Sequence, residues 1–462
     1  MGKIVQLPTK RCEPQYRPVH DCITELNNIA LMRGAKYQHV LTGIIELKRA
    51  IAIEPDSREL WANMGALFWK ARQYEEALAC AERSMTMGVI PEALHVKALV
   101  LQDLHDFDEA EIFFAQAIAL DSTYLNARWC RSMMRLSLGD YQRGWKDYET
   151  RIPFRQKEGK KVYPNFPAPY WKGEDVYGKR MFCCIEQGIG DTLFFSRFLP
   201  WLHDQVGADG RLYLCCSHEI IVLLWKYVEA GLVEYVPEGT PIPKSDYSVV
   251  IGSLPFHAHC TLETIPSDPG FIRERAEQQM RFGGAYVPPP LGPHPYKVGI
   301  CWTGNPEQER NDERSIPLEL MLTLAEHPNV WLYGLQVGPG QADIERLGAR
   351  DIICDLGSQC RDRGLTIAAT AILQMDLVVT CCTSIAHLCG VLGREAWVVL
   401  TKNPYWVWMH DRPDSPWYPS LRLFRQTKTD DWRSVMQQVR DELFERLDAA
   451  RRMGNQLITK SR

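Results

Sequence analysis

The sequence lacks long apolar runs, blocks of like charge and the paired cysteines of a zinc site. None of its apolar stretches reaches the roughly 18 residues that a membrane-spanning helix needs. The start, MGKIVQLPTKR, has neither the apolar core of a signal peptide nor the Ser or Thr of a myristoylation signal. Lysine and arginine (53) nearly balance aspartate and glutamate (57), without the basic excess of a dedicated nucleic-acid binder. These absences favour a cytoplasmic protein without a membrane span.

The fifteen cysteines contain no CxxC motif. Three adjacent pairs lie in apolar runs: Cys183-Cys184, Cys215-Cys216 and Cys381-Cys382. Small buried hydrophobes in a reducing compartment explain this layout better than a disulfide framework or a zinc site. The hydrophobic content of 45% is ordinary for a globular protein, and a length of 462 residues predicts about three domains.

Three similar tetrads recur in the first third of the chain at spacings of 33 and 34 residues, namely Tyr74-Glu75-Glu76-Ala77, Phe107-Asp108-Glu109-Ala110 and Tyr141-Gln142-Arg143-Gly144. Each follows a helix-period stretch with a small residue at the same place: Gly65, Ala98 or Ser132. This pattern looks like a tetratricopeptide array, in which about three or more helical pairs must stack to cover their apolar faces. Four repeats are predicted over about residues 24–153. Their concave face would bind peptides or help to assemble a homo-oligomer.

After the repeats, short apolar runs alternate with amphipathic helices. A proline-rich linker is expected at Pro153–Pro169, and a second proline cluster begins at Pro288. The expected strands are Arg180–Ile185, Arg211–Cys216 and Ser248–Ile251, then Lys297–Trp302, Val330–Gly334, Leu377–Thr380 and Ala396–Leu400. Continuous apolar strands are typical of buried parallel sheets. The prediction is two facing Rossmann-like halves with a cleft between them, and a last helix over Asp430–Met453.

A glycine-rich turn, Glu186-Gln187-Gly188-Ile189-Gly190-Asp191-Thr192, follows the first expected strand and precedes an expected helix over Thr192–His203. Such glycines allow a sharp turn and leave amide hydrogens at a helix start, which favours a bound anion or polar oxygen. The turn is not the dinucleotide fingerprint, because Leu193 stands where a third glycine would be needed. Whether Asp191 takes part in chemistry or only caps the helix stays open at this point.

A second turn lies in the other half, where Thr383 and Ser384 open an expected helix over Ile385–Leu392. Their hydroxyls and amides would face a phosphate, assisted by the helix dipole. His387 follows one turn later. A lone histidine on an apolar helix is more often structural, but its place after two hydroxyl residues favours a ligand role.

Other expected strand ends point to the same cleft, because ligands of open α/β sheets bind beyond the carboxyl ends of the strands. Gly304 and Asn305 form a turn that leads into a polar run. Arg310 and Arg314 in this run are candidates to clamp phosphates, although such a run is usually just solvated. Gln336 offers an amide at the end of the next strand.

Three further segments are ambiguous. The aromatic segment Trp406–Pro419 either walls a nucleotide pocket or plugs the hydrophobic hinge. His257 and His259 are acceptor-side groups, metal ligands or packing residues, and an HxH pair without a third ligand favours packing. The Asp106-Phe107-Asp108 sequence lies at a repeat turn and is not interpreted as a metal site. No metal or cofactor is expected.

Four motifs in this order resemble bacterial tetratricopeptide glycosyltransferases: the EQGxGD turn, WTGNP with RSIP, TSIAHL, and DSPWYP with LFRQ. The likeness covers about residues 24–445, and the catalytic part is similar to the heptosyltransferase family with a GT-B fold. The resemblance implies a nucleotide-sugar donor in the C-terminal half, an acceptor in the N-terminal half, inversion at the anomeric carbon and no required metal. It implies that Asp191 is a general base and that Thr383, Ser384 and His387 contact donor phosphates. Cys382 stands where many relatives have an acid, which puts sugar or ribose contacts in question.

We therefore expect a repeat domain over 1–153, an acceptor-side Rossmann-like domain over 154–290 and a donor domain over 291–462. The predicted activity is an inverting, metal-independent sugar transfer to a hydroxyl, on a protein recruited by the repeats. The alternatives are a binding protein with an inert nucleotide-sugar-sensing region, and a nucleotide-sugar epimerase. A glycan or another polymer, including modified DNA, stays open as the acceptor. Beside Asp191, Thr383, Ser384 and His387, the candidates are Gly304, Asn305, Arg314 and Gln336 for the donor and Gln187, Gly188, Gly190 and His257 for the acceptor.

Overall fold

The computed structural model describes residues 23–24, 26–28, 39–152, 166, 168–267, 270–291, 295–308 and 310–460. Its contacts divide the chain into two compact units, residues 1–127 and 128–462. Most of the predicted linker Pro153–Pro169 and part of the first predicted repeat lie outside the described residues. Within the described ranges, no helix is both long and apolar enough to cross a bilayer.

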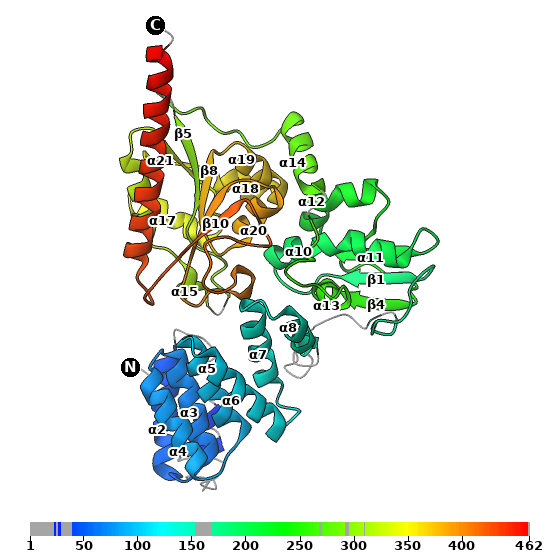
Figure 1. The fold of residues 1–462 in the computed structure, drawn as a ribbon, viewed down its shortest axis with the longest axis vertical. Helices are drawn as coiled ribbons and strands as arrows, with labels where there is room; N and C mark the ends of the chain where they lie inside the picture. Colours follow the sequence, from blue (N-terminus) through cyan, green and yellow to red (C-terminus); the bar gives the residue numbers. More distant parts are fainter. Residues whose placement is uncertain are drawn as a thin grey trace, which may run out of the picture. The chain divides into compact units, whose positions relative to one another are not determined.

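The first unit is built of consecutive helices (Figure 1), as the 33- to 34-residue period predicts. They are α2 (Val40–Ile53), α3 (Arg58–Lys70), α4 (Tyr74–Thr86), α5 (Pro91–Asp103), α6 (Phe107–Leu120) and the start of α7 (Leu125–Ser137). The aromatic residue of each tetrad begins a helix. A Cβ on Gly65 of α3 would lie 3.1 Å from the carbonyl oxygen of Ala77 in α4, so this small position permits close helix packing. Trp69 Nε1 donates to Asp103 Oδ2 at 2.8 Å, one repeat later.

The second unit begins with the rest of α7 and with α8 (Tyr141–Tyr148), followed by a four-stranded parallel sheet of order β3-β2-β1-β4. Its strands are β1 (Arg180–Cys184), β2 (Arg211–Cys216), β3 (Glu234–Pro237) and β4 (Tyr247–Val250). Cys183 in the centre pairs with Leu214 on one side and Val249 on the other. The flanking helices are α10 (Ile189–Phe195), α11 (Leu199–Val206), α12 (His218–Glu229), α13 (Leu254–His257) and α14 (Phe271–Arg281).

A six-stranded parallel sheet of order β10-β9-β8-β5-β6-β7 follows. It contains β5 (Tyr296–Cys301), β6 (Val330–Gly334), β7 (Ile353–Asp355), β8 (Leu377–Cys381), β9 (Ala396–Leu400) and β10 (Leu421–Arg425). Numbered within this half, the order is the doubly wound 3-2-1-4-5-6, which reverses between β5 and β8. Its helices include α15 (Asn311–Arg314), α16 (Leu318–Leu322), α17 (Ala342–Arg346), α18 (Gly357–Arg363), α19 (Leu365–Leu373) and α20 (Ser384–Val391). Helical repeats followed by two Rossmann-like halves confirm the predicted fold class.

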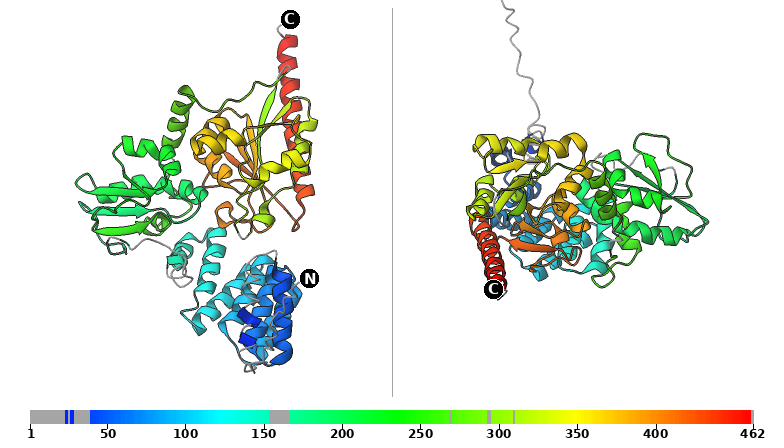
Figure 2. Two further views of the ribbon diagram at one scale, coloured as in Figure 1. Left: turned by 180° about the vertical axis from the view of Figure 1, so that it is seen from behind. Right: turned by 90° about the horizontal axis from the view of Figure 1, so that it is seen from above.

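The two α/β halves of the second unit pack through helices. Helix α10 of the first half lies against α20 of the second half, and α12 and α14 of the first half lie against α19 of the second. The last helix, α21 (Trp432–Lys460), packs on β9, β10 and α16 of the second half (Figure 2). One core cluster runs through both halves and includes Trp145 and Tyr148 of α8. The end of the predicted repeat region therefore belongs to the second unit, and the expected domain boundary at residue 153 falls inside that unit.

The predicted long helix over Thr192–His203 is wrong in detail. The structure has α10, a 3₁₀ turn over Ser196–Phe198 and α11, which carries Pro200 in its first turn. A proline there removes a backbone donor, so the chain restarts a helix rather than continuing one. Three edge strands, β3, β7 and β10, were not predicted. A 3₁₀ turn over Thr323–Glu326 likewise follows α16 directly.

Candidate active site

The glycine-rich turn lies where the strand order of the first sheet reverses, between β1 and β4. Such switch points open a crevice beyond the carboxyl ends of the strands. Glu186 lies two residues after the end of β1, and its side chain is fully buried. A Cβ on Gly252, just after β4, would collide with Glu186 Oε1, so glycine is needed there for the two strand ends to approach. The turn is thus held against the neighbouring strand.

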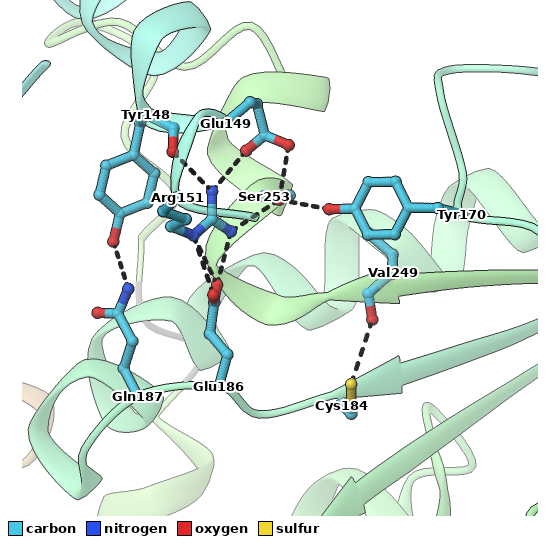
Figure 3. A network of polar contacts seen from close by, with 9 residues as sticks. All are labelled: Tyr148, Glu149, Arg151, Tyr170, Cys184, Glu186, Gln187, Val249 and Ser253. Carbon is cyan, nitrogen blue, oxygen red and sulfur yellow. Dashed lines mark hydrogen bonds and ion pairs between the residues drawn. The ribbon is translucent and has the colours of Figure 1, made fainter. Parts of the chain in front are cut away.

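Arg151 is the centre of a buried polar network beneath this turn (Figure 3). Its Nη2 donates to Glu186 Oε1 at 2.6 Å and to Ser253 Oγ at 2.7 Å, and its Nη1 donates to Glu149 Oε1 at 2.7 Å. Ser253 Oγ also lies 2.7 Å from the hydroxyl of Tyr170. Two carboxylates around one guanidinium satisfy the buried charge. The network fastens the residues that follow α8 to both strand ends of the switch point.

Asp191 lies in the first turn of α10, whose N-cap is Gly188. Asp191 is therefore not the N-cap of this helix. Its Oδ1 accepts a hydrogen bond of 3.1 Å from the hydroxyl of Tyr405, a residue of the other half. Burial, and then the charge of Asp191, raise the pKa of Tyr405 well above its usual value, so the phenol stays a donor.

The second strand-order reversal, between β5 and β8, carries the other predicted turn. Thr383 is the N-cap of α20, and Ser384 begins the helix. The Thr383 hydroxyl makes no capping bond and instead lies 3.4 Å from Thr380 Oγ1 and 3.8 Å from Cys301 Sγ. Arg314 joins the two loops, because its Nη1 donates to the carbonyl oxygen of Cys382 at 2.9 Å.

His387 of α20 lies directly under the glycine-rich turn. A Cβ on Gly190 would lie 2.7 Å from His387 Cδ2, so only glycine lets α10 approach α20 this closely. His387 Nδ1 lies 2.9 Å from the Tyr418 hydroxyl. Burial, followed by the charges of Arg197 and Arg314, lowers the pKa of His387 to about 3. The ring is therefore neutral near pH 7 and can act as a hydrogen-bond donor, not as a cation.

Cys382 is the point at which the two halves meet electrostatically. Burial raises the pKa of its thiol, Arg314 and a hydrogen bond from Trp408 oppose this, and the charge of Asp191 adds to it. Trp408 Nε1 donates to Cys382 Sγ at 2.9 Å. This partly buried thiol thus interacts electrostatically with both Asp191, the predicted base of the first half, and Arg314, the predicted phosphate ligand of the second. The structure brings Asp191, Arg314, His387 and the start of α20 together.

Several predicted ligand residues instead shape the loops. Gln336 is 2% exposed, and its Oε1 accepts from the backbone nitrogens of Trp302 and Thr303. Gly304 gives room to the Arg314 guanidinium, which a Cβ would meet. Asn305 is exposed, and its side chain accepts from the backbone of Glu307 at 3.0 Å. These side chains order the β5 turn, on which Arg314 depends.

Two of the predicted acceptor-side residues, Gln187 and His257, also make contacts within the fold. Gln187 donates to the Tyr148 hydroxyl at 2.7 Å (Figure 3). His257 stacks on Trp171 with ring centroids 4.2 Å apart, and burial lowers its pKa to about 4. This arrangement favours the packing alternative for His257. Arg310 pairs with Glu313, an exposed contact within one turn, as expected for a solvated run. Among the described residues, no group of three or more His, Cys, Asp or Glu side chains could hold a metal.

The aromatic segment Trp406–Pro419 is a plug and not the wall of an open pocket. Trp406, Trp408, Trp417 and Tyr418 are at most 2% exposed. Trp417 Nε1 donates to the hydroxyl of Tyr141 in α8 at 2.7 Å. The segment therefore fills the space between α8, α10 and α20.

An open pocket of about 400 Å³ lies beside the β5 turn. Its lining includes Gly304, Asn311, Ser315, Gly340 and Asp343, which follow β5 and β6. The pocket therefore opens at the carboxyl ends of these strands, next to the loop that carries Arg314.

Two functional candidates were missed from the sequence. Arg151 lies among polar residues at the end of a repeat helix, and Tyr405 lies just before the aromatic segment. Neither belongs to a local motif, because each acts on a residue at least 35 positions away. Only the fold brings these pairs together.

No family model matches the chain. Protein FlbA of Caulobacter vibrioides is 24% identical over 417 residues, which cover 85% of this chain and 68% of FlbA. A mutant O-GlcNAc transferase of Thermobaculum terrenum is similar over 94% of both chains, with 12% identity and a TM-score of 0.30. The ADP-heptose LPS heptosyltransferase II of E. coli is similar over 58% of this chain and 99% of its own, with 12% identity and a TM-score of 0.36. The fold assignment rests on the sheet order and the strand register of this chain.

Proposed function

We propose that the chain is a glycosyltransferase that moves a sugar from a nucleotide-sugar donor to a hydroxyl acceptor, with inversion. The observation that carries the proposal is the convergence of Asp191 from the first half with Arg314 and the start of α20 from the second. Their common neighbour is Cys382. A carboxylate beside a cationic, amide-rich loop combines a proton acceptor with a diphosphate site.

In the proposed reaction, Asp191 accepts the proton of the acceptor hydroxyl as its oxygen attacks the anomeric carbon. The bond from that carbon to the diphosphate breaks, and the electron pair leaves with the diphosphate oxygen. Arg314 and the first-turn amides of α20 stabilise the charge that grows there. These groups supply the positive charge that a metal supplies in other transferases, so turnover should persist in a chelator.

The test is release of nucleoside diphosphate from a panel of sugar nucleotides, with and without candidate acceptors. We expect release that depends on an acceptor, and Asp191→Asn should lower turnover about 100- to 10,000-fold. Donor binding by calorimetry should change little in this variant. Asp209→Asn, at an exposed acid of the same half, is the matched control. Unchanged turnover in Asp191→Asn would remove Asp191 as the base.

Arg314→Gln separates donor binding from base catalysis. Loss of a charge-assisted contact with the diphosphate should weaken donor affinity about 10-fold or more. Donor binding without release in the unsubstituted protein would support the nucleotide-sugar sensor instead.

We also propose that the acceptor is a protein held by the repeats. Stacked helical repeats offer an extended surface suited to extended peptides. Deleting residues 1–124 should then raise KM for a protein acceptor much more than KM for a short peptide or for the donor. Equal effects on all three substrates would contradict a recruiting role.

A further inference from the structure

Tyr405 connects the two α/β halves at the proposed base. It lies in the loop after β9, and its hydroxyl donates to Oδ1 of Asp191 in α10 at 3.1 Å. Its ring packs beside Trp406, with centroids 5.6 Å apart, and Trp406 is 2% exposed. The phenol is therefore anchored in the buried aromatic segment and reaches across to a carboxylate of the other half.

This contact has two physical consequences. A hydrogen bond donated to a carboxylate stabilises its charged form, so it keeps the carboxylate ionised at lower pH. It also holds one oxygen in a fixed direction, which limits rotation of the carboxylate. A base needs both properties, because it must be ionised and must point at the proton it accepts.

From this geometry we infer that Tyr405 is a positioning residue for Asp191, and that it orients the base only when the two halves are packed as in this structure. The inference rests on the proposed glycosyl transfer, and it deepens that proposal by naming the group that directs the base. Tyr405 itself need not touch the substrate. Through this hydrogen bond, the packing of the two halves determines whether the Asp191 carboxylate is ionised and correctly oriented.

Other titratable and charged groups lie near Asp191. Their protonation must be considered before a change in the pH profile of a Tyr405 variant is assigned to Asp191. Asp191 acts electrostatically on Tyr148 of α8 and on Cys382 of the second half. Arg151 and Glu186 act on the same Tyr148, Arg314 acts on the same Cys382, and His387 lies beside the position of a Cβ on Gly190. Burial keeps the phenol of Tyr148 and the thiol of Cys382 uncharged by raising their pKa values, and it keeps His387 neutral by lowering its pKa. Between pH 5 and pH 8, about the range of an enzyme assay, these three groups thus keep their protonation states. A change in the acid limb of the pH profile therefore comes from a carboxylate and not from these three groups, and the NMR titration below assigns it to Asp191.

The test variant is Tyr405→Phe, which removes the hydroxyl and keeps the ring that packs on Trp406. We expect kcat to fall about 10-fold, because a misdirected base reaches its proton less often. KM for the donor should stay within about two-fold. The acid limb of the kcat profile should move up by about one pH unit, since the lost hydrogen bond favoured the charged carboxylate. Tyr286→Phe, at a tyrosine whose side chain is exposed, is the matched control.

A second measurement does not depend on activity. In the full chain with ¹³C-labelled aspartate carboxyl groups, Asp191 can be assigned by comparison with Asp191→Asn and titrated by NMR. Its pKa should be higher in Tyr405→Phe than in the unsubstituted protein. If transfer occurs but Tyr405→Phe matches the unsubstituted protein in kcat, pH profile and titration, the inference is overturned and the function stands. If transfer fails but the titration shifts, the function falls and the contact is still shown to hold the carboxylate.

Discussion

Arg151 and Glu186 form a buried ion pair between the end of the repeat region and the glycine-rich turn. Arg151 Nη2 lies 2.6 Å from Glu186 Oε1, and the two side chains are 1% and 0% exposed. Arg151 also lies over the ring of Tyr148, 4.4 Å from its centroid. A contact this well buried fixes the turn that carries Asp191 relative to α8.

Breaking this pair from one side should destabilise the second unit strongly. Arg151→Met leaves the buried Glu186 carboxylate and the partly buried Glu149 carboxylate without their cation, and we expect a loss of about 3–5 kcal/mol in the free energy of unfolding. Urea unfolding followed by tryptophan fluorescence measures the loss. The exposed pair Arg211–Glu234, with side chains 61% and 51% exposed, is the control. Its removal should cost at most about 1 kcal/mol, and equal losses at both pairs would contradict this account.

Gly190 should tolerate no side chain. The Cβ of Gly190→Ala would lie 2.7 Å from His387 Cδ2, which forces α10 and α20 apart. We expect a destabilisation of about 1–3 kcal/mol, typical of overpacking, together with weaker donor binding. Gly188→Ala is the matched comparison, because the nearest atom to its Cβ, Asp191 Oδ2, is 3.6 Å away and its φ of −66° suits alanine. Thermal unfolding of the two variants should differ clearly, and similar melting temperatures would show that the helices adjust.

Truncated chains can test where the second unit begins. Deleting residues 1–124 leaves α7 and α8 whole, so the remaining chain should unfold cooperatively with native near-UV circular dichroism. Deleting residues 1–152 removes Trp145, whose Nε1 donates to the Cys260 carbonyl at 3.1 Å and whose ring packs on Trp406 at 5.3 Å. This shorter chain should aggregate or lose its near-UV signal. A well-folded product would place the boundary after α8, as the sequence suggested.

The sequence predicted elements whose signal is local. The tetrads begin α4, α6 and α8, and the apolar runs at Val330–Gly334 and Ala396–Leu400 match β6 and β9. The edge strand β7 escaped prediction because it has three residues and ends in Asp355. Short edge strands are stabilised by pairing with a neighbour more than by their own composition.

The candidate site was predictable where a turn and a helix start adjoin in sequence. Asp191 and the Thr383–His387 segment were located in this way. The sequence did not indicate that the side-chain oxygen of Gln336 accepts hydrogen bonds from the backbone of the turn after β5, since this contact depends on the register of β5 and β6. Nor did it indicate that the aromatic segment packs on α8, because Trp417 and Tyr141 are 276 residues apart.

Buried neutral histidines should make the second unit sensitive to acid. Burial, and then Arg197 and Arg314, lower the pKa of His387 from 6.5 to about 3 in the folded chain. Below about pH 6.5, His387 is therefore protonated in the unfolded chain but stays neutral in the folded chain. The contribution of neutral His387 to the free energy of unfolding is fully present above about pH 6.5. It is lost as the pH falls toward the pKa of His387 in the folded chain, by up to ~1.4 kcal/mol per pH unit. In His387→Gln the free energy of unfolding should be lower at pH 7.5 but should fall less steeply between pH 6.5 and 4. Urea unfolding at a series of pH values measures this slope, with His218→Gln, at an exposed histidine, as the control. A slope that is the same in His387→Gln as in the unsubstituted chain would mean that this histidine is not excluded from protonation in the folded state.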